Sequence, residues 1–254
     1  MKPTRLLTAC FSPTGATGKV AGAVAEGIAY PNEGLDLSAA VEAADIGADT
    51  LLLAAVPVYG GRVPAVALER LSRLRGCGQS AVAVVVYGNR EFEDALLELK
   101  NALEGMNFQV AAAAAFIGEH SIVRSIAAGR PDGADLELAR RFGMDAAGKL
   151  ASHDIPPAVQ VPGNVPYREF KGMPAHPKAG ASCVRCGTCA RMCPVGAIPV
   201  EHPETTDAEK CITCMRCAAI CPQGARALPA PALLASKTML SVKAAGYKIP
   251  QTFL

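Results

Sequence analysis

Residues 183–194 read CVRCGTCARMCP, and residues 211–222 read CITCMRCAAICP. Both segments have the spacing C-x-x-C-x-x-C-x-x-x-C-P, and a Gly-Ala pair follows each at the same offset, at residues 196–197 and 224–225. An internal duplication is the simplest explanation of this match. The clustering differs from the scattered cysteines of a secreted disulfide framework, and it indicates metal binding.

The spacing within each segment selects the kind of metal centre. Three thiolates at two-residue intervals on a tight loop reach three corners of one iron–sulfur cube, whereas the fourth cysteine starts a helix turned away and ligates the other cube. The sequence therefore predicts two 4Fe-4S clusters, one held by Cys183, Cys186, Cys189 and Cys221 and the other by Cys211, Cys214, Cys217 and Cys193. A structural zinc site has no use for the extra cysteine and the Cys-Pro in each copy. Residues 180–228 resemble the two-cluster bacterial ferredoxins.

The preceding part of the chain has a different pattern. From residue 5 to about 152, short apolar runs alternate with segments of helical periodicity. The runs are too continuous in apolar residues for strands with one face in water, so they predict a buried parallel sheet. They lie at residues 5–11, 35–37, 50–58, 81–87 and 108–117. The expected fold class is α/β, a doubly wound parallel sheet followed by a small α+β two-cluster domain.

Four parts of the chain are expected from these patterns. Residues 1–155 form the α/β domain, and residues 156–179, which are rich in proline, form a semi-rigid linker. Residues 180–228 form the two-cluster domain. Residues 229–254 form a C-terminal helix, expected over 232–245, and a tail that docks on a neighbouring surface which the sequence does not identify.

The composition of the chain indicates which partners and which cellular location to expect. The formal net charge is +2, and no basic run stands out that could neutralise a row of phosphates, so nucleic acid is not an expected partner. No apolar stretch has the length and purity of a membrane helix, and too few residues precede Cys10 for a secretion signal. We therefore expect a cytoplasmic protein, where thiolates stay reduced.

Residues 12–17 form a candidate anion site. They read SPTGAT, and they end the first predicted strand and open a helix. Backbone N–H groups at a helix start, together with the hydroxyls of Ser12, Thr14 and Thr17, can cradle a phosphate without an arginine. Neither the nucleotide P-loop nor the G-x-G-x-x-G fingerprint matches this segment. A simple capped helix start remains the alternative.

Two further loops are expected at the same edge of the sheet. Tyr59-Gly60-Gly61 follows the third predicted strand and Tyr87-Gly88-Asn89 follows the fourth. The tyrosines could flank an isoalloxazine ring, and the glycines allow the backbone to approach it closely. With the motif order and the segments YGGRVP and YGNR, nearly the whole chain resembles the flavodoxin–ferredoxin fusion proteins.

That resemblance implies a flavodoxin-like domain with FMN bound by the first loop, including Gly15 and Ala16, and by the two tyrosine loops. Pro13 and Ala16 depart from the Gly and Asn usual in the family, which points to weaker FMN binding. His120 lies on the same edge, and the more frequent role of such a lone histidine is structural.

The leading functional reading is an electron-transfer protein that relays electrons between FMN and the two clusters. No nucleophile–base pair indicates a catalytic site, so the sequence does not decide whether the protein is an enzyme. One alternative is a ferredoxin-coupled flavin reductase that acts on a small acceptor such as a quinone or a corrinoid partner. Another is a ferredoxin whose flavodoxin-like domain has lost FMN. A redox partner protein or a small electron acceptor is expected, and the sequence gives no indication of the oligomeric state.

Overall fold

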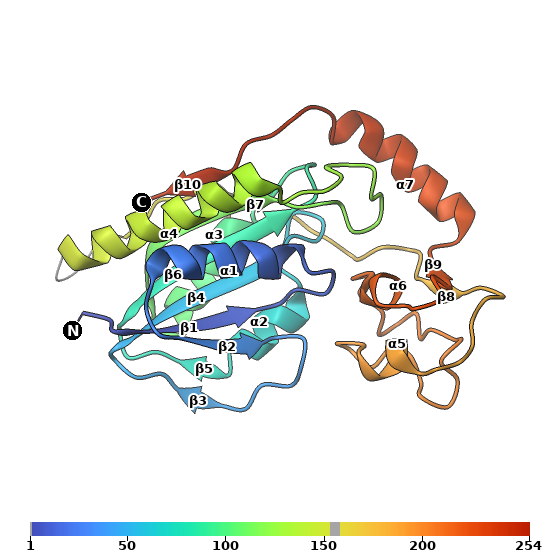
Figure 1. Cartoon of the computed structure of the whole chain (residues 1–254), viewed down its shortest axis with the longest axis horizontal. Helices are drawn as coiled ribbons and strands as arrows, with labels where there is room; N and C mark the ends of the chain where they lie inside the picture. Colours follow the sequence, from blue (N-terminus) through green and yellow to red (C-terminus); the bar gives the residue numbers. More distant parts are fainter. Residues whose placement is uncertain (1, 153–157) are drawn as a thin grey trace.

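A parallel sheet forms the centre of the N-terminal domain in the computed structural model, which describes residues 2–152 and 158–254. Its strands are β1 (Arg5–Cys10), β2 (Asn32–Asp36), β4 (Thr50–Pro57), β6 (Ser80–Tyr87) and β7 (Gln109–Ile117). These parallel strands lie in the order β2-β1-β4-β6-β7 (Figure 1). That is the flavodoxin-like doubly wound order. The predicted parallel sheet is confirmed.

Helices cover both faces of the sheet, which explains why β4, β6 and β7 are apolar along almost their whole length, whereas the edge strand β2 is polar and mostly exposed. Helices α1 (Ala16–Ile28) and α4 (Gly133–Ser152) lie on one face. Helices α2 (Ala65–Leu71) and α3 (Ala95–Gly105) lie on the other. Alternate residues of β6 enter the two cores, Val82 and Val84 on one side and Ala83 and Val85 on the other. The short strands β3 (Ala44–Asp45) and β5 (Leu74–Arg75), which the sequence analysis missed, pair beside the sheet.

The C-terminal tail returns to this sheet. Helix α7 (Ala230–Lys243) is followed by strand β10 (Gln251–Phe253), which pairs antiparallel with β7 and becomes the sixth strand. Side chains from the N-terminal domain hold the connecting segment. Asn89 Nδ2 donates to the carbonyls of Ala244 at 2.7 Å and Gly246 at 2.9 Å. Arg130 donates to the Lys248 carbonyl at 2.7 Å, and its guanidinium lies 4.5 Å from the Tyr247 ring centroid.

The described part of the proline-rich linker is bound to the N-terminal domain along much of its length. Asp94, at the start of α3 and only 2% exposed, accepts hydrogen bonds from the backbone N–H groups of Asn164 at 2.8 Å and Arg168 at 2.7 Å. Val159 is buried in the core between the sheet and α3. Residues 156 and 157 lie outside the described residues. The described part of the linker, which the sequence analysis expected to be semi-rigid, is thus held against the N-terminal domain by these contacts.

The cysteine-rich module is small and carries little regular structure. Strands β8 (Lys178–Ala179) and β9 (Arg226–Ala227) pair antiparallel, and helices α5 (Thr188–Arg191) and α6 (Arg216–Ala219) each follow a cysteine loop. Among the residues that the structure describes, two hydrogen bonds join the module to the N-terminal domain. Arg70 donates to the Pro194 carbonyl at 2.5 Å, and Arg216 donates to Ser38 Oγ at 3.0 Å. None of the helices in residues 2–152 and 158–254 is long and apolar enough to cross a membrane.

Helices α1 and α4 approach each other so closely that glycine is required at their contact. A Cβ on Gly143 would overlap the Val24 carbonyl, and one on Gly27 would overlap the Arg140 carbonyl. A backbone carbonyl cannot move aside as a flexible side-chain end can. Gly148, on the same helix α4, has no atom within 4 Å of where its Cβ would lie.

We therefore expect Gly143→Ala to destabilise the protein by about 1–3 kcal/mol, because overpacking forces the helices apart. Gly148→Ala is the matched control, and it should stabilise by about 0.5–1 kcal/mol through helix propensity. Urea unfolding of both variants and the wild type measures these differences. Equal stabilisation by the two substitutions would contradict the close helix contact.

Candidate cofactor sites

The cysteines of the module line two separate cavities. Cys183, Cys186, Cys189 and Cys221 line the first, and Cys193, Cys211, Cys214 and Cys217 line the second. Each cavity therefore takes three cysteines from one repeat and the last cysteine from the other. The structure brings together the two sets that the interleaved spacing predicts.

The backbone of the two repeats follows the same path around these cavities. Arg185 and Thr213, each two residues after the first cysteine of their repeat, have φ of 54° and 51°. Gly187 and Met215 come two residues later and have φ of 75° and 62°. A left-handed β-branched residue such as Thr213 costs about 1–3 kcal/mol. Both loops nevertheless contain these left-handed residues, and the cysteines of each loop line a common cavity.

Burial in the second cavity disfavours free thiolates. Burial raises the pKa of Cys214 to about 12 and that of Cys217 to about 11, so a metal is needed to hold these thiolates ionised at neutral pH. Backbone donors are in place for the two interleaved cysteines. The N–H of Ala197 donates to Cys193 Sγ and that of Ala225 to Cys221 Sγ, both at 3.3 Å. The donor set fits iron–sulfur clusters.

A third cavity lies at the carboxyl edge of the parallel sheet. Gly15, in the left-handed conformation with φ 94°, leads into helix α1, and Ser12 Oγ accepts the N–H of Gly18 at 2.8 Å. This geometry turns the start of α1 toward the sheet edge, and Thr17 is 3% exposed there. The predicted site residues that line the cavity are Thr14, Ala16, Thr17, Tyr59, Tyr87 and Gly88. The first loop and the two tyrosine loops thus meet at one place.

Other predicted residues have different surroundings. Asn89 is buried, and its side-chain nitrogen donates both of its hydrogen bonds to the C-terminal tail, as described above. This nitrogen is therefore not free to bind a cofactor. Gly60 and Gly61 lie under the linker, since a Cβ on Gly60 would overlap the Phe170 ring and one on Gly61 would overlap Glu93 and Arg168. Neither glycine lines the cavity at the sheet edge. Ser12 caps the first turn of α1.

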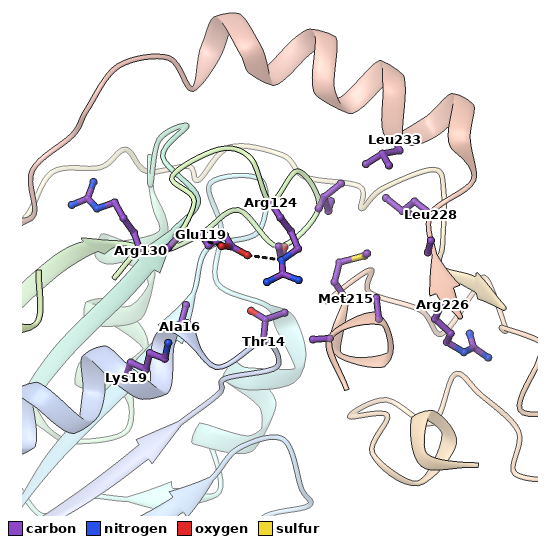
Figure 2. A pocket seen from close by; sticks show the side chains of 16 residues that line it. Thr14, Ala16, Lys19, Glu119, Arg124, Arg130, Met215, Arg226, Leu228 and Leu233 are labelled. Atoms are coloured by element: carbon purple, nitrogen blue, oxygen red, sulfur yellow. Dashed lines mark hydrogen bonds and ion pairs between the residues drawn. The ribbon is translucent and has the colours of Figure 1, made fainter. Parts of the chain in front are cut away.

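A larger cavity of about 450 Å³ lies between the two domains. It shares Thr14, Ala16, Glu119 and Ser121 with the cavity at the sheet edge. Met215, Ala218 and Ala219, at and around helix α6, line its opposite wall. Figure 2 shows Arg124 in this space between Thr14 and Met215, with its ion pair to Glu119. Lys19 adds further positive charge to the lining, and Arg130, which is paired with the buried Asp135, also borders the cavity.

The remaining charged residues near this edge serve the structure. His120 Nδ1 accepts the N–H groups of Ile122 and Val123, both at 3.2 Å, and burial lowers the pKa of His120 to about 4. It is therefore neutral at physiological pH. Arg62 pairs with the buried Glu98, with Nε donating to Oε2 at 2.8 Å. Burial raises the pKa of Tyr87 to about 12, so Tyr87 keeps its proton.

Comparison with known proteins bears on both domains. Residues 182–225 match the family model described as 4Fe-4S dicluster domain. No curated protein sequence matches the chain.

Solved structures similar to the N-terminal part include several flavodoxins. A flavodoxin from the domain Archaea is 14% identical with a TM-score of 0.39, and the alignment covers 58% of this chain and 99% of that one. Flavodoxin 1 from Bacillus cereus is 16% identical with a TM-score of 0.40, covering 57% and 97%. A Fusobacterium nucleatum flavodoxin mutant bound to flavin mononucleotide is 14% identical with a TM-score of 0.37, covering 60% and 96%.

The strand order of the sheet and the dicluster match together decide the architecture. The chain joins a flavodoxin-like fold to a 4Fe-4S dicluster domain. The matched segment contains all eight cysteines that line the two cavities of the module. This dicluster domain makes the protein an iron–sulfur protein of electron transfer.

Sequence reasoning missed the residues that hold the two domains of the fusion together. Asp94, Arg130 and Asn89 act through partners that lie far along the chain, in the linker and the tail. An isolated Asp or Arg in a loop carries no signal of such a partner. For the same reason, the sequence analysis assigned Asn89 to the cofactor site, whereas its side-chain amide binds the C-terminal tail.

The interleaving can be tested with one cysteine. Cys193→Ala should remove a ligand from the cluster site of the second repeat, because Cys193 lines the cavity of Cys211, Cys214 and Cys217. Iron and acid-labile sulfide analysis should then show damage to one cluster of the two. Spectroscopy of the variant should show the other cluster intact.

Cys221→Ala is the matched control for this variant, and it should damage the opposite cluster, since Cys221 lines the cavity of Cys183, Cys186 and Cys189. Pairing Cys193→Ala with Cys183→Ala should abolish both clusters. If that double variant instead retained one cluster, Cys193 and Cys183 would belong to the same site.

Proposed function

We propose that the protein is an electron-transfer flavo-iron–sulfur protein that relays electrons between FMN and two 4Fe-4S clusters. FMN, when bound, exchanges one or two electrons, whereas each cluster exchanges one. Thr14, Thr17 and the N–H groups at the start of α1 would hold the phosphate. Tyr59 and Tyr87 would border the ring. The cluster ligands are the two interleaved cysteine sets.

One short helix carries this proposal. Helix α6 contributes Cys217 to the second cysteine set, and its next residues, Ala218 and Ala219, line the cavity that also contains Thr14. Tyr59 lines the sheet-edge cavity, and burial together with the nearby Cys214 raises the pKa of its hydroxyl. The second cluster site and the proposed flavin site are therefore neighbours. None of the four cysteines of the first cluster site lines the cavity that contains Thr14, and Cys186 is exposed to solvent.

The lining of the cavity suits a phosphorylated ligand. Lys19 and Arg124 lie in the wall, and the α1 N-terminus adds the partial positive charge of its free N–H groups. The cavity between the domains has a volume of about 450 Å³, which is within the usual range for small-molecule and cofactor pockets, whereas the adjoining sheet-edge cavity lined by Tyr59 and Tyr87 has about 40 Å³. These features favour retention of FMN over a flavodoxin-like domain that has lost it.

The proposed domain division follows the sequence expectation, with one addition. Residues 1–155 form the flavodoxin-like domain, 156–179 the linker, 180–228 the dicluster domain and 229–254 the C-terminal helix and tail. In this division the last strand, β10, completes the sheet of the first domain.

A second function is favoured by one feature of the same cavity. Ile122, Leu228 and Leu233 give its wall an apolar portion beside the cationic one. Such a wall suits a small apolar acceptor at the flavin edge, so a flavin reductase is the alternative proposal. Steady oxidation of the reduced protein by a soluble quinone analogue, saturable and blocked by Leu233→Glu, would support it over a carrier role.

FMN binding tests the first loop directly. Thr14→Val combined with Thr17→Val should weaken FMN by about 2–4 kcal/mol, because two hydroxyl donors to a charged phosphate are lost. Titration of the flavin-stripped holo-cluster protein with FMN, followed by flavin fluorescence, measures the affinity. Thr238→Val, on the exposed side of α7, is the control and should leave it unchanged. Wild-type affinity in the double variant would remove the phosphate site from this loop.

The relay itself has a kinetic signature. Electrons from chemically reduced clusters should reach FMN at a rate independent of protein concentration, since both sites belong to one chain. Stopped-flow mixing at several protein concentrations measures this rate. A rate proportional to protein concentration would mean that the transfer is intermolecular, and the intramolecular relay would then be wrong even if FMN binds as expected.

A further inference from the structure

Arg226 carries a buried positive charge with no carboxylate among its hydrogen-bond partners. The residue is 3% exposed. Nη1 donates to Thr206 Oγ1 at 2.7 Å and to the Pro177 carbonyl at 3.3 Å, and Nη2 donates to the carbonyls of Pro203 and Thr205. Its Nε has no hydrogen-bond partner within residues 2–152 and 158–254. Neutral acceptors solvate this cation but do not neutralise it.

The guanidinium lies between the two cluster sites. Arg226 lines the cavity of Cys183, Cys186, Cys189 and Cys221. It also reaches the other site through its hydrogen bonds: Pro177 and Thr206, which accept from its Nη1, line the cavity of Cys193, Cys211, Cys214 and Cys217. One side chain is thus within electrostatic reach of both sites.

The internal repeat shows that the fold does not require a cation at this position. Arg226 stands five residues after Cys221, and the residue at the same offset from Cys193 is Ile198. Ile198 is also buried, at 4% exposure, and it packs in the apolar cluster of Cys189 and Ala190. The first repeat therefore fills the equivalent position with an aliphatic side chain.

A charge placed so deep is costly unless an opposite charge balances it. A 4Fe-4S cluster with its four thiolates is net negative, and it becomes more negative on reduction, so a nearby cation stabilises the reduced state more than the oxidised state. We propose that Arg226 is a counter-charge shared by the two cluster sites, and that it raises the reduction potentials of both clusters. This inference rests on the two cysteine sets and is independent of FMN.

The reduction potentials of two variants distinguish the effect of the Arg226 charge from the effect of its hydrogen bonds. Arg226→Gln removes the charge and should lower the equilibrium constant for reduction of each cluster by about tenfold, which is about 59 mV for a one-electron couple. Arg226→Lys keeps the charge and should recover most of that loss. The midpoint potentials come from redox titration of the anaerobic holoprotein monitored by electron paramagnetic resonance. Equal shifts in both variants would mean that Arg226 acts only through its hydrogen bonds, and the proposal would be overturned.

Lys178→Gln is the control for charge removal in general. Lys178 lies in strand β8 of the same module, but its side chain is exposed and outside the lining of both cysteine cavities, so solvent screens it and the potentials should stay close to those of the wild type. A shift as large as that of Arg226→Gln would remove the special role of the buried position. Iron and sulfide analysis of the wild type tests the cysteine assignment separately, because a protein without two clusters would fail there first.

The wild type provides a measurement that does not depend on the folding of the variants. Protein labelled with ¹⁵N in the guanidinium group of arginine alone should, when reduced, show hyperfine coupling of a guanidinium nitrogen to the cluster spins in pulsed electron paramagnetic resonance, and Arg226→Lys should remove this coupling. The unpartnered Nε of Arg226 is the expected origin. Absence of any arginine coupling would place the guanidinium outside cluster contact and would overturn the proposal even if both variants lost their clusters.

Discussion

The parallel sheet must be covered on both faces, and the rest of the molecule follows from this constraint. Strands β4, β6 and β7 are buried along almost their whole length, and α1, α2, α3 and α4 occupy both faces. At the carboxyl edge of the strands, the helix α1 N-terminus, the tyrosine loops and the dicluster domain meet. The cavity at the sheet edge and the cavity between the domains share residues because both lie at this edge.

Two connections fix the dicluster domain at that edge. The linker that leads into it is held by Asp94, and the segment that leads out of it is held by Asn89 and Arg130. Arg130 can serve in this way because Asp135 neutralises it in a buried pair. Direct hydrogen bonds between the domains are few by comparison. The position of helix α6 beside the sheet-edge cavity is thus determined largely by what holds the two ends of the module.

The sequence was sufficient where a local pattern has one physical meaning. Continuous apolar runs predicted the buried parallel strands, and the spacing of Cys183 to Cys193 and of Cys211 to Cys221 predicted which cysteines would gather. It was insufficient where a residue acts through a distant partner. Asn89 has a left-handed φ of 62°, a conformation that asparagine favours in turns. Its side-chain amide nevertheless binds the C-terminal tail, more than 150 residues later in the chain. Gly60 and Gly61 permit a close approach, but the sequence does not say that Phe170 and Arg168 of the linker make it.

The pairing of β10 with β7 has a consequence for how the molecule is assembled. Since the last residues of the sequence form the outer strand of the first domain's sheet, the dicluster domain is an insertion within that sheet and not an appendage to it. During synthesis the edge of β7 stays unpaired until the whole iron-binding segment has left the ribosome. An unpaired edge of an apolar strand is prone to intermolecular pairing. A chain interrupted anywhere in the module would therefore expose that edge, whereas a chain with a completed sheet contains all eight cysteines that line the two cavities.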